Sequence, residues 1–371
     1  MSNIKVSNIP EMTVDKVIDK LSQSYISVIN KKLPVSILPS VMLWGAPGVG
    51  KSQAIRQIKD EIEYYTKKKV NVTDVRLLLF NPIDLRGIPT SNKDKTLAIW
   101  LKPQIFNMDP SDNVVNILFL DEISAAPQSV QAAAYQITLD RVIGEHKLPD
   151  NCIVICAGNR VTDKSVAYKM PKALANRLLH IDVEADFDSW KKWAVSKGIN
   201  DKVIGFLSFR TDLLVNSDEG FDDLAFTTPR SWEKVSDILN IISDDVKDMF
   251  DLISGLIGTG VATEFRTWCK IYHSLPDVED IFSGKCNIVP KMPDELYALS
   301  SSIVSVARKY KDNMSKIENS INYIEKLPPD FATVILKDYI YLEKDYKHKL
   351  MKIPSFIRWI NTKGKLLNAI N

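Results

Sequence analysis

The stretch GAPGVGKS, from Gly45 to Ser52, constrains the fold of this chain more than any other feature. It fits the pattern G-x-x-x-x-G-K-[ST], in which glycines let the backbone curl so that its N–H groups face phosphate oxygens. The apolar run VMLW before it predicts a buried strand, and the residues from Ser52 to Lys67 predict a helix. The dipole of such a helix favours an anion at its start. We therefore expect a phosphate-binding loop between a strand and a helix.

The side chains of this loop have separate expected tasks. Lys51 would reach the β- and γ-phosphates of a nucleotide, and Ser52 would hold Mg²⁺. We expect nucleotide contacts along the whole stretch, namely from Gly45, Ala46, Pro47, Gly48, Val49, Gly50, Lys51, Ser52 and Gln53.

A second stretch, NILFLDEISAAP from Asn116 to Pro127, joins an apolar run to two adjacent carboxylates. A strand that ends in Asp121 and Glu122, some 70 residues after a phosphate loop, brings both acids to the carboxyl edge of the sheet. Open α/β sheets bind their ligands at that edge. We expect Asp121 to complete the Mg²⁺ site with Ser52, and Glu122 to orient and polarise an attacking water.

Short apolar runs alternate with helical patterns over the first half of the chain. Such runs, bounded by turn signals, are typical of strands covered on both faces, so the pattern predicts an α/β fold with a parallel five-stranded sheet. The predicted strands are residues 41–44, 75–80, 115–121, 152–158 and 178–182, with a helix over 128–139.

After about residue 186 the sequence predicts helices alone. We expect an N-terminal helical segment over residues 1–34, an αβα domain with the phosphate loop over 35–185, a second, helical domain over 186–275 and a helical extension over 276–371. Residues 301–371 hold 13 Lys or Arg against 7 Asp or Glu, so the extension is basic, whereas the whole chain has a net charge of only +2.

Three further residues suit phosphate hydrolysis, each with an ordinary alternative. Asn159 ends the fourth strand, beside the strand of Asp121, and would hydrogen-bond the γ-phosphate or the water; the alternative is a turn residue. Arg177, at a helix–strand junction, would stabilise transition-state charge on a neighbour's nucleotide or form a surface salt bridge. Arg230, at the start of a helix, would reach the nucleotide or pair with Glu233.

These elements, in this order, resemble the MoxR type of AAA+ ATPases. GAPGVGKS resembles the Walker A motif, LFLDEIS the Walker B motif, AGN sensor 1, LANR the arginine-finger stretch and TPRSW sensor 2. Two stretches, residues 84–103 and 140–151, resemble the inserted hairpins of that family. Pro commonly follows the sensor 1 Asn there, whereas this chain has Arg160, which would contact the nucleotide, a neighbour or nothing.

The resemblance implies that residues 35–185 are an AAA+ P-loop ATPase domain and residues 186–275 its helical lid domain. It also implies an ATP- and Mg²⁺-dependent homo-oligomer, a hexameric ring with its ATP sites at subunit interfaces. It implies a chaperone-like remodeller of a protein client, often paired with a von Willebrand factor A domain protein. The alternative function is an AAA+ motor or loader that acts on nucleic acid through the basic C-terminal helices. No zinc-finger or helix-turn-helix signature supports that alternative, so a protein client is favoured.

The remaining sequence features predict a cytoplasmic protein without a membrane partner. The N-terminus, MSNIKVSNIPEM, is polar, and no run is apolar enough to span a bilayer. Of the four cysteines, Cys152 and Cys156 lie in the apolar run CIVIC. No second Cys or His pair at a suitable spacing completes a metal site, so we interpret both as reduced core residues.

Overall fold

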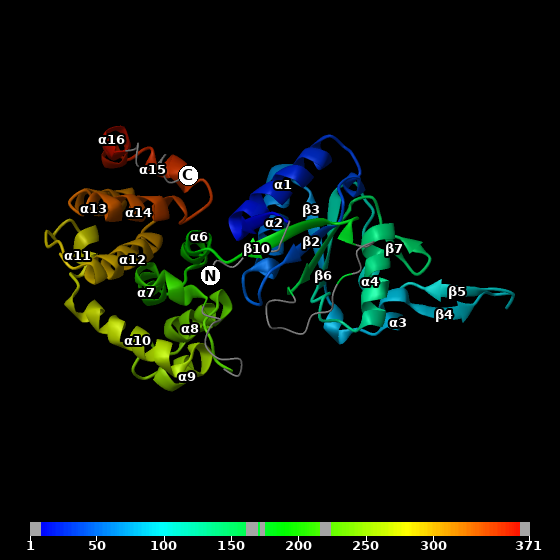
Figure 1. Cartoon of the computed structure of the whole chain (residues 1–371). Coiled ribbons are helices and arrows are strands. Elements are labelled where there is room, and N and C mark those ends of the chain that lie inside the picture. Colours follow the sequence, from blue (N-terminus) through cyan, green and yellow to red (C-terminus); the bar gives the residue numbers. More distant parts are fainter. Residues whose placement is uncertain (1–8, 161–169, 171–174, 216–223, 364–371) are drawn as a thin grey trace. The chain divides into compact units, whose positions relative to one another are not determined.

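The computed structural model describes residues 9–160, 170, 175–215 and 224–363, and the chain divides into two compact units, residues 1–186 and 187–371 (Figure 1). The first unit is built around a parallel six-stranded sheet with the strand order β1-β10-β2-β9-β6-β3. Its strands are β1 Glu11–Thr13, β2 Val41–Trp44, β3 Lys69–Arg76, β6 Val114–Asp121, β9 Cys152–Gly158 and β10 Leu179–Glu184. The predicted α/β fold with a parallel sheet is confirmed.

Helices cover both faces of this sheet (Figure 1). Alternate residues of β6 point to opposite faces, as the pleat of a strand requires. Ile117 and Phe119 join a core with α1 Val14–Asn30 and α2 Lys51–Thr66. Leu118 and Leu120 join a second core with α4 Gln128–Asp140. The sheet is thus the middle of three layers, which explains why its central strands are apolar throughout.

Two features of the sheet differ from the sequence prediction. The strand predicted over residues 75–80 is wrong in position, since β3 ends at Arg76 and residues 77–79 form a 3-10 turn. Leu78 and Leu79 are exposed, while β3 is an edge strand whose polar and apolar residues mix. An apolar run was therefore a poor guide to this strand. The sixth strand, β1, is three residues long, too short for a periodic signal.

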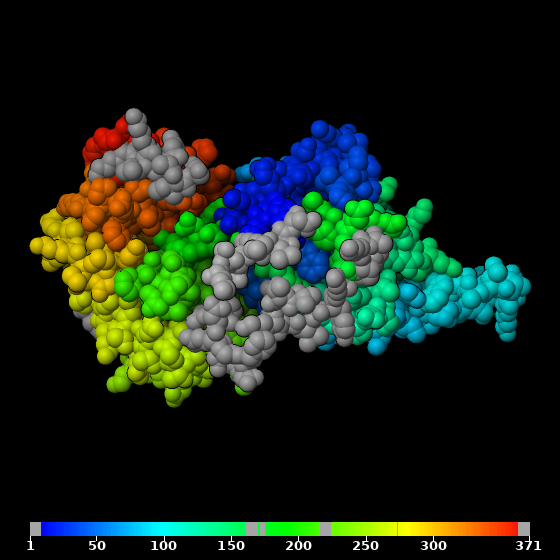
Figure 2. Space-filling model, in the orientation of Figure 1, coloured from blue at the N-terminus to red at the C-terminus, as the bar shows by residue number. Residues whose placement is uncertain are grey.

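Both inserted hairpins are present. β4 Ile88–Ser91 pairs antiparallel with β5 Ala98–Leu101, just after the short helix α3 Pro82–Arg86. β7 Val142–Ile143 pairs antiparallel with β8 His146–Lys147. The first hairpin stands out from the surface of its unit (cyan in Figure 2).

The second unit is helical over its described residues. Its helices are α6 Phe187–Lys197, α7 Asp201–Phe209, α8 Pro229–Ile241, α9 Phe250–Ile257, α10 Thr259–Cys269, α11 Val278–Phe282, α12 Pro293–Lys309, α13 Met314–Ile324, α14 Pro329–Ile340, α15 Tyr346–Leu350 and α16 Pro354–Lys363. One continuous hydrophobic core runs from Trp190 to Trp359. The proposed division of this unit into a lid and an extension at residue 275 stays a prediction. In the described parts of the chain, no helix has the length and apolar character needed to cross a membrane.

Candidate nucleotide site

The phosphate loop connects the central strand β2 to the helix α2, and its backbone depends on glycine. Gly45, Gly48 and Gly50 all have positive φ, at 151°, 81° and 107°. A Cβ at Gly45 would lie 2.5 Å from the Val183 carbonyl oxygen on β10, so no other residue fits there without a backbone shift. The loop therefore curls at the start of α2, and the N-terminal end of a helix attracts an anion through its first backbone N–H groups.

The buried Lys51 holds its ammonium group inside this curl. Its Nζ donates to the carbonyl oxygens of Gly45, at 2.6 Å, and Ala46, at 3.0 Å. It also donates to Asn159 Oδ1 at 3.2 Å. Asn159 follows β9, which lies between β2 and β6 in the sheet. The structure thus brings Lys51 and Asn159 together at the carboxyl edge of the sheet.

Ser52 and Asp121 meet at the same edge. Ser52 Oγ donates to Asp121 Oδ2 at 3.1 Å, across 69 residues of sequence. Among the described residues, no cluster of three or more His, Cys, Asp or Glu side chains is arranged to hold a metal ion. One hydroxyl and one carboxylate nevertheless fit Mg²⁺, which is usually bound by one or two carboxylates, substrate phosphates and water.

Glu122 has an unusual backbone. Its φ is 59°, in the left-handed region that non-glycine residues rarely adopt. Its N–H donates to Asp121 Oδ1 at 2.8 Å, and the next N–H, of Ile123, donates to the Ala157 carbonyl oxygen on β9 at 3.0 Å. This turn lets two adjacent acids both stay at the edge of the sheet, with Glu122 half-buried.

Ser124 is a positioning residue that the sequence analysis missed. Its Oγ accepts a hydrogen bond from the Asn159 backbone N–H at 2.9 Å. A Cβ at Gly158 would lie 2.8 Å from that same Oγ, so Gly158 permits the approach. Ser124 thereby fixes the end of β9 beside the acid pair. The signal in the sequence was a small polar residue two positions after Glu122, which is too common to be recognised.

Arg160 has a structural partner. Its Nε donates to Asp182 Oδ1 on β10 at 2.7 Å, and its Nη2 contacts the same oxygen. Burial raises the pKa of the Asp182 carboxyl, and the bonds from Arg160 oppose that rise. Arg160 therefore ties the end of β9 to β10, an option that the sequence analysis did not consider.

Arg177 lies at the opposite edge of the sheet. It is exposed and precedes β10, whose first residue, Leu179, pairs with Val41, the first residue of β2. The phosphate loop follows the last residue of β2, so the length of that strand, roughly 13 Å for four residues, separates the two edges. The structure therefore does not bring Arg177 close to Lys51 and Asp121.

A histidine connects these two edges. Trp44, the residue before the phosphate loop, donates from Nε1 to His180 Nδ1 at 2.9 Å, and the two rings are stacked. The other nitrogen, His180 Nε2, lies 2.7 Å from the carbonyl oxygen of Ala175, on the turn that carries Arg177. Since Nδ1 accepts, Nε2 carries the proton and donates to Ala175.

Arg230 belongs to the second unit. It is exposed at the second position of α8, behind a capping box in which Thr228 Oγ1 accepts from the Ser231 N–H at 3.0 Å. The sequence analysis gave an ion pair with Glu233 as the alternative role of Arg230. In the described part of the chain no such ion pair is formed.

Comparison with known proteins gives one informative match. The model of a family described as "ATPase family associated with various cellular activities (AAA)" matches residues 40–180, which include the phosphate loop, the acid pair and Arg177. No curated protein sequence matches the chain.

Solved structures resemble the chain only loosely. PCH-2 of C. elegans is 14% identical, with a TM-score of 0.36 over 68% of this chain and 66% of PCH-2. A mutant of RuvB from Thermotoga maritima is 18% identical, with a TM-score of 0.37 over 80% of this chain and 84% of RuvB. NtrX from Brucella abortus in complex with ATP is 12% identical, with a TM-score of 0.33 over 90% and 70%. Likeness at this level carries no argument about function.

Proposed function

We propose that this chain, which carries an AAA+ ATPase domain over residues 40–180, works as an oligomeric, Mg²⁺-dependent ATPase that remodels a protein client. The observation that carries the proposal is the meeting of Lys51, Asn159, Ser52 and Asp121 at one edge of the sheet. These groups supply a cation for phosphates, an amide beside it and two oxygens for a metal.

Each residue has a proposed role in hydrolysis. The loop residues Gly45 to Gln53 cradle the phosphates of ATP, with Lys51 on the β- and γ-phosphates. Ser52 and Asp121 would hold Mg²⁺, which would neutralise charge that develops on the phosphates. Glu122 orients the attacking water and accepts its proton, while Asn159 hydrogen-bonds the γ-phosphate or that water.

Arg177 and Arg230 are proposed to complete the nucleotide site, although neither belongs to the group of residues that meets at the carboxyl edge of the sheet. Arg177 is at the far edge of the sheet from its own phosphate loop, which supports action on the nucleotide of a neighbouring subunit. A ring of subunits in head-to-tail contact, proposed to be a hexamer, provides such a neighbour at every interface. Arg230 is proposed to act as sensor 2, on the strength of the TPRSW motif alone.

Within the AAA+ class we propose the MoxR type. LFLDEIS, LANR and the hairpins β4–β5 and β7–β8 support it. The client is then a protein, with a von Willebrand factor A domain protein as a candidate partner. A cytoplasmic location fits the buried Cys152 and Cys156, both free thiols whose pKa is raised to about 12 by burial.

The basic C-terminal helices give the nucleic-acid alternative little support. Several of their cations are paired with acids of the same unit. These pairs are Lys309 with Glu279, Lys311 and Lys349 with Glu343, and Arg358 with Glu325. A paired cation has less to gain from a phosphate backbone. A DNA shift assay at two salt concentrations tests this alternative, because salt-sensitive binding would favour it.

The central experiment compares Lys51→Ala with Glu122→Gln. Lys51→Ala should lose tight ATP binding, because the cation within the loop is removed. Glu122→Gln should still bind ATP but hydrolyse it a few hundred times more slowly, since losing one transition-state contact costs roughly 3–4 kcal/mol. ATP affinity and phosphate release are measured for both. Wild-type turnover in Glu122→Gln would contradict the role given to Glu122.

A further inference from the structure

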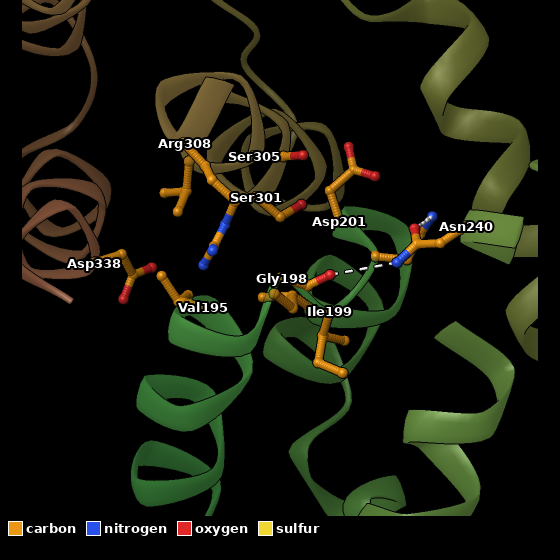
Figure 3. Close-up of a pocket in the computed structure, with 12 residues that line it drawn as sticks. Val195, Gly198, Ile199, Asp201, Asn240, Ser301, Ser305, Arg308 and Asp338 are labelled. Carbon is orange, nitrogen blue, oxygen red and sulfur yellow. Dashed lines mark hydrogen bonds between the residues drawn. The ribbon is translucent and has the colours of Figure 1, made fainter. Parts of the chain in front are cut away.

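A cavity of about 90 Å³ lies inside the second unit, among residues of α7, α8, α12 and α14 and the turn after α6 (Figure 3). The Arg308 side chain extends from α12 into this space. Gly198 lies beneath its guanidinium, and even an added Cβ there would stay 3.7 Å from Nε, Cζ and Nη1. The cavity is thus built around a cation.

The guanidinium of Arg308 is uncompensated in the described structure. Its Nη2 is buried and has no hydrogen-bond partner among the described residues. Burial lowers the pKa of Arg308, and no acid of the described segments opposes that effect. Arg308 as a whole is half-buried, but a buried donor of a cation that has no acceptor is costly, so a group that accepts a hydrogen bond from Nη2 would be bound favourably.

Two carboxylates also line the cavity, but both have other partners. Asp338 Oδ2 is 2.7 Å from Lys191 Nζ, in a buried ion pair. Asp201 Oδ2 accepts a hydrogen bond from Ser302 Oγ at 2.7 Å. Neither forms an ion pair with Arg308, so the site for an anion is not filled by the chain's own described acids.

The wall of the cavity is fixed before any ligand arrives. Asn240 Nδ2 donates to the Gly198 carbonyl oxygen at 3.3 Å (dashed in Figure 3), and Asn200 Nδ2 donates to Asn240 Oδ1 at 2.9 Å. Ser305, one helical turn before Arg308, is exposed at the rim. A rigid, open cavity loses little entropy when a small ligand enters it.

We propose that this cavity binds a small oxyanion, a phosphate or carboxylate group, against Arg308. The volume admits such a group but not a nucleotide, and the exposed rim leaves room for the rest of a larger molecule to protrude. The site is separate from the nucleotide site and does not depend on the roles proposed there.

The test uses the full chain with Lys51→Ala, so that the phosphate loop no longer competes for the probe. Inorganic phosphate, and separately acetate, is titrated against chloride at constant ionic strength while thermal unfolding is followed by tryptophan fluorescence. Five of the seven tryptophans lie in the second unit. At ten times its Kd, a bound anion should raise the Tm by about 4 °C, and the Tm should rise further in proportion to the logarithm of the anion concentration. A Tm that rises with the logarithm of the concentration of either probe supports the site, and a Tm that rises with neither overturns it.

Three variants show whether Arg308 is responsible. Arg308→Gln should abolish the rise in Tm with the anion, whereas Lys291→Gln, which removes one exposed positive charge, should keep it. Ser305→Glu places a carboxylate three residues before Arg308 on the same helix, where it can pair with the guanidinium. It should keep the fold and lose the response to the probe. An unchanged response in Ser305→Glu overturns the assignment, even where Arg308→Gln fails to fold.

Discussion

At the scale of single residues, the acid pair of the nucleotide site depends on an unusual backbone conformation at Glu122, beside the hydrogen bonds that the Asp121 side chain accepts. A non-glycine residue in the left-handed region costs on the order of 1–3 kcal/mol. Glu122 keeps that conformation because its own N–H and that of Ile123 are both satisfied, by Asp121 and by β9. The proposed water-orienting carboxylate is therefore positioned before ATP binds, which lowers the reorganisation needed for hydrolysis.

A second residue-scale feature is the buried carboxyl of Asp201 at the start of α7. Burial raises its pKa, and the hydrogen bond from Ser302 opposes the rise. Between the pKa of an unfolded Asp, about 3.9, and the raised folded value, the folded chain binds more protons than the unfolded chain. The free energy of unfolding therefore falls as the pH rises through that window.

We predict that Asp201→Asn removes this decline. The single amide oxygen of Asn can still accept from the Lys202 N–H, which bonds to Asp201 Oδ1 at 3.0 Å. The NH2 group of Asn replaces Asp201 Oδ2 and can donate to the Ser302 hydroxyl oxygen, which donates to Oδ2 in the wild type. Urea unfolding is measured by tryptophan fluorescence from pH 4 to 7. As the pH rises, the free energy of unfolding of the variant should increase relative to that of the wild type. The increase should be about 1.4 kcal/mol for each pH unit by which the Asp201 pKa is raised. If the free energies of unfolding of variant and wild type changed with pH in the same way, the prediction would be contradicted. Asp251→Asn, an exposed carboxylate, serves as the control.

The sequence was informative about these residues wherever a motif is local. The phosphate loop and the Asp121–Glu122 pair could be predicted because each is a short stretch at the end of a strand. Ser124, and the pairing of Arg160 with Asp182, could not be predicted in the same way. Both depend on contacts between segments more than 20 residues apart, whose register no local pattern shows.

At the scale of elements, the phosphate loop and the turn that carries Arg177 are both attached to one pair of neighbouring strands, β2 and β10. β2 leads into the phosphate loop, and β10 follows the Arg177 turn. His180 is the side chain that touches both, through Trp44 and through the Ala175 carbonyl oxygen. A movement of the phosphate loop or of the Arg177 turn would therefore strain the hydrogen bond of His180 with Trp44 or the one with Ala175.

We predict that His180→Phe lowers kcat roughly tenfold while ATP affinity stays near the wild-type value. Phe keeps a ring against Trp44 but loses both hydrogen bonds, each worth about 1 kcal/mol. Steady-state hydrolysis and nucleotide binding are measured together. Trp44→Phe, which removes only the first bond, should have a smaller effect. A large loss of ATP affinity with unchanged kcat would show that His180 serves its own phosphate loop instead of the Arg177 turn.

Elements with a strong internal pattern could be predicted, and those defined by their neighbours could not. The central strands β2 and β9 begin and end where the sequence placed them, because they are buried on both faces. The edge strand β3 was misplaced, since only one side of an edge strand is fixed by pairing and its residues are partly exposed. The three residues of β1 are held as a strand by β10 alone.

At the scale of the whole molecule, each unit has its own hydrophobic interior. The first unit has a core on each face of the sheet, and the second has one core from α6 to α16. The segment predicted as a C-terminal extension shares that core with the predicted lid. Truncation after residue 275 would therefore expose the apolar face of α7, which packs against α12, and the extension is not a detachable tail.

The last prediction concerns assembly, because Arg177 cannot complete its own site from the far edge of the sheet. If it acts on a neighbour's nucleotide, ATPase activity per subunit should rise with protein concentration. Arg177→Ala should bind ATP normally, since its phosphate loop is intact, yet hydrolyse it at least about a thousandfold more slowly, as expected for a lost arginine finger. Full activity of this variant would contradict the finger role.

Mixing two inactive variants separates action on a neighbour from action within one chain. In a mixed ring of Lys51→Ala and Arg177→Ala chains, some interfaces pair the intact loop of the Arg177→Ala chain with the intact Arg177 of the Lys51→Ala chain. At a 1:1 ratio about a quarter of head-to-tail interfaces should be of this kind. Those interfaces should recover activity, measured as phosphate release, in mixtures that native mass spectrometry shows to co-assemble. Co-assembled rings that stay inactive would count against the neighbour's role, because every such interface would contain a complete set of proposed groups.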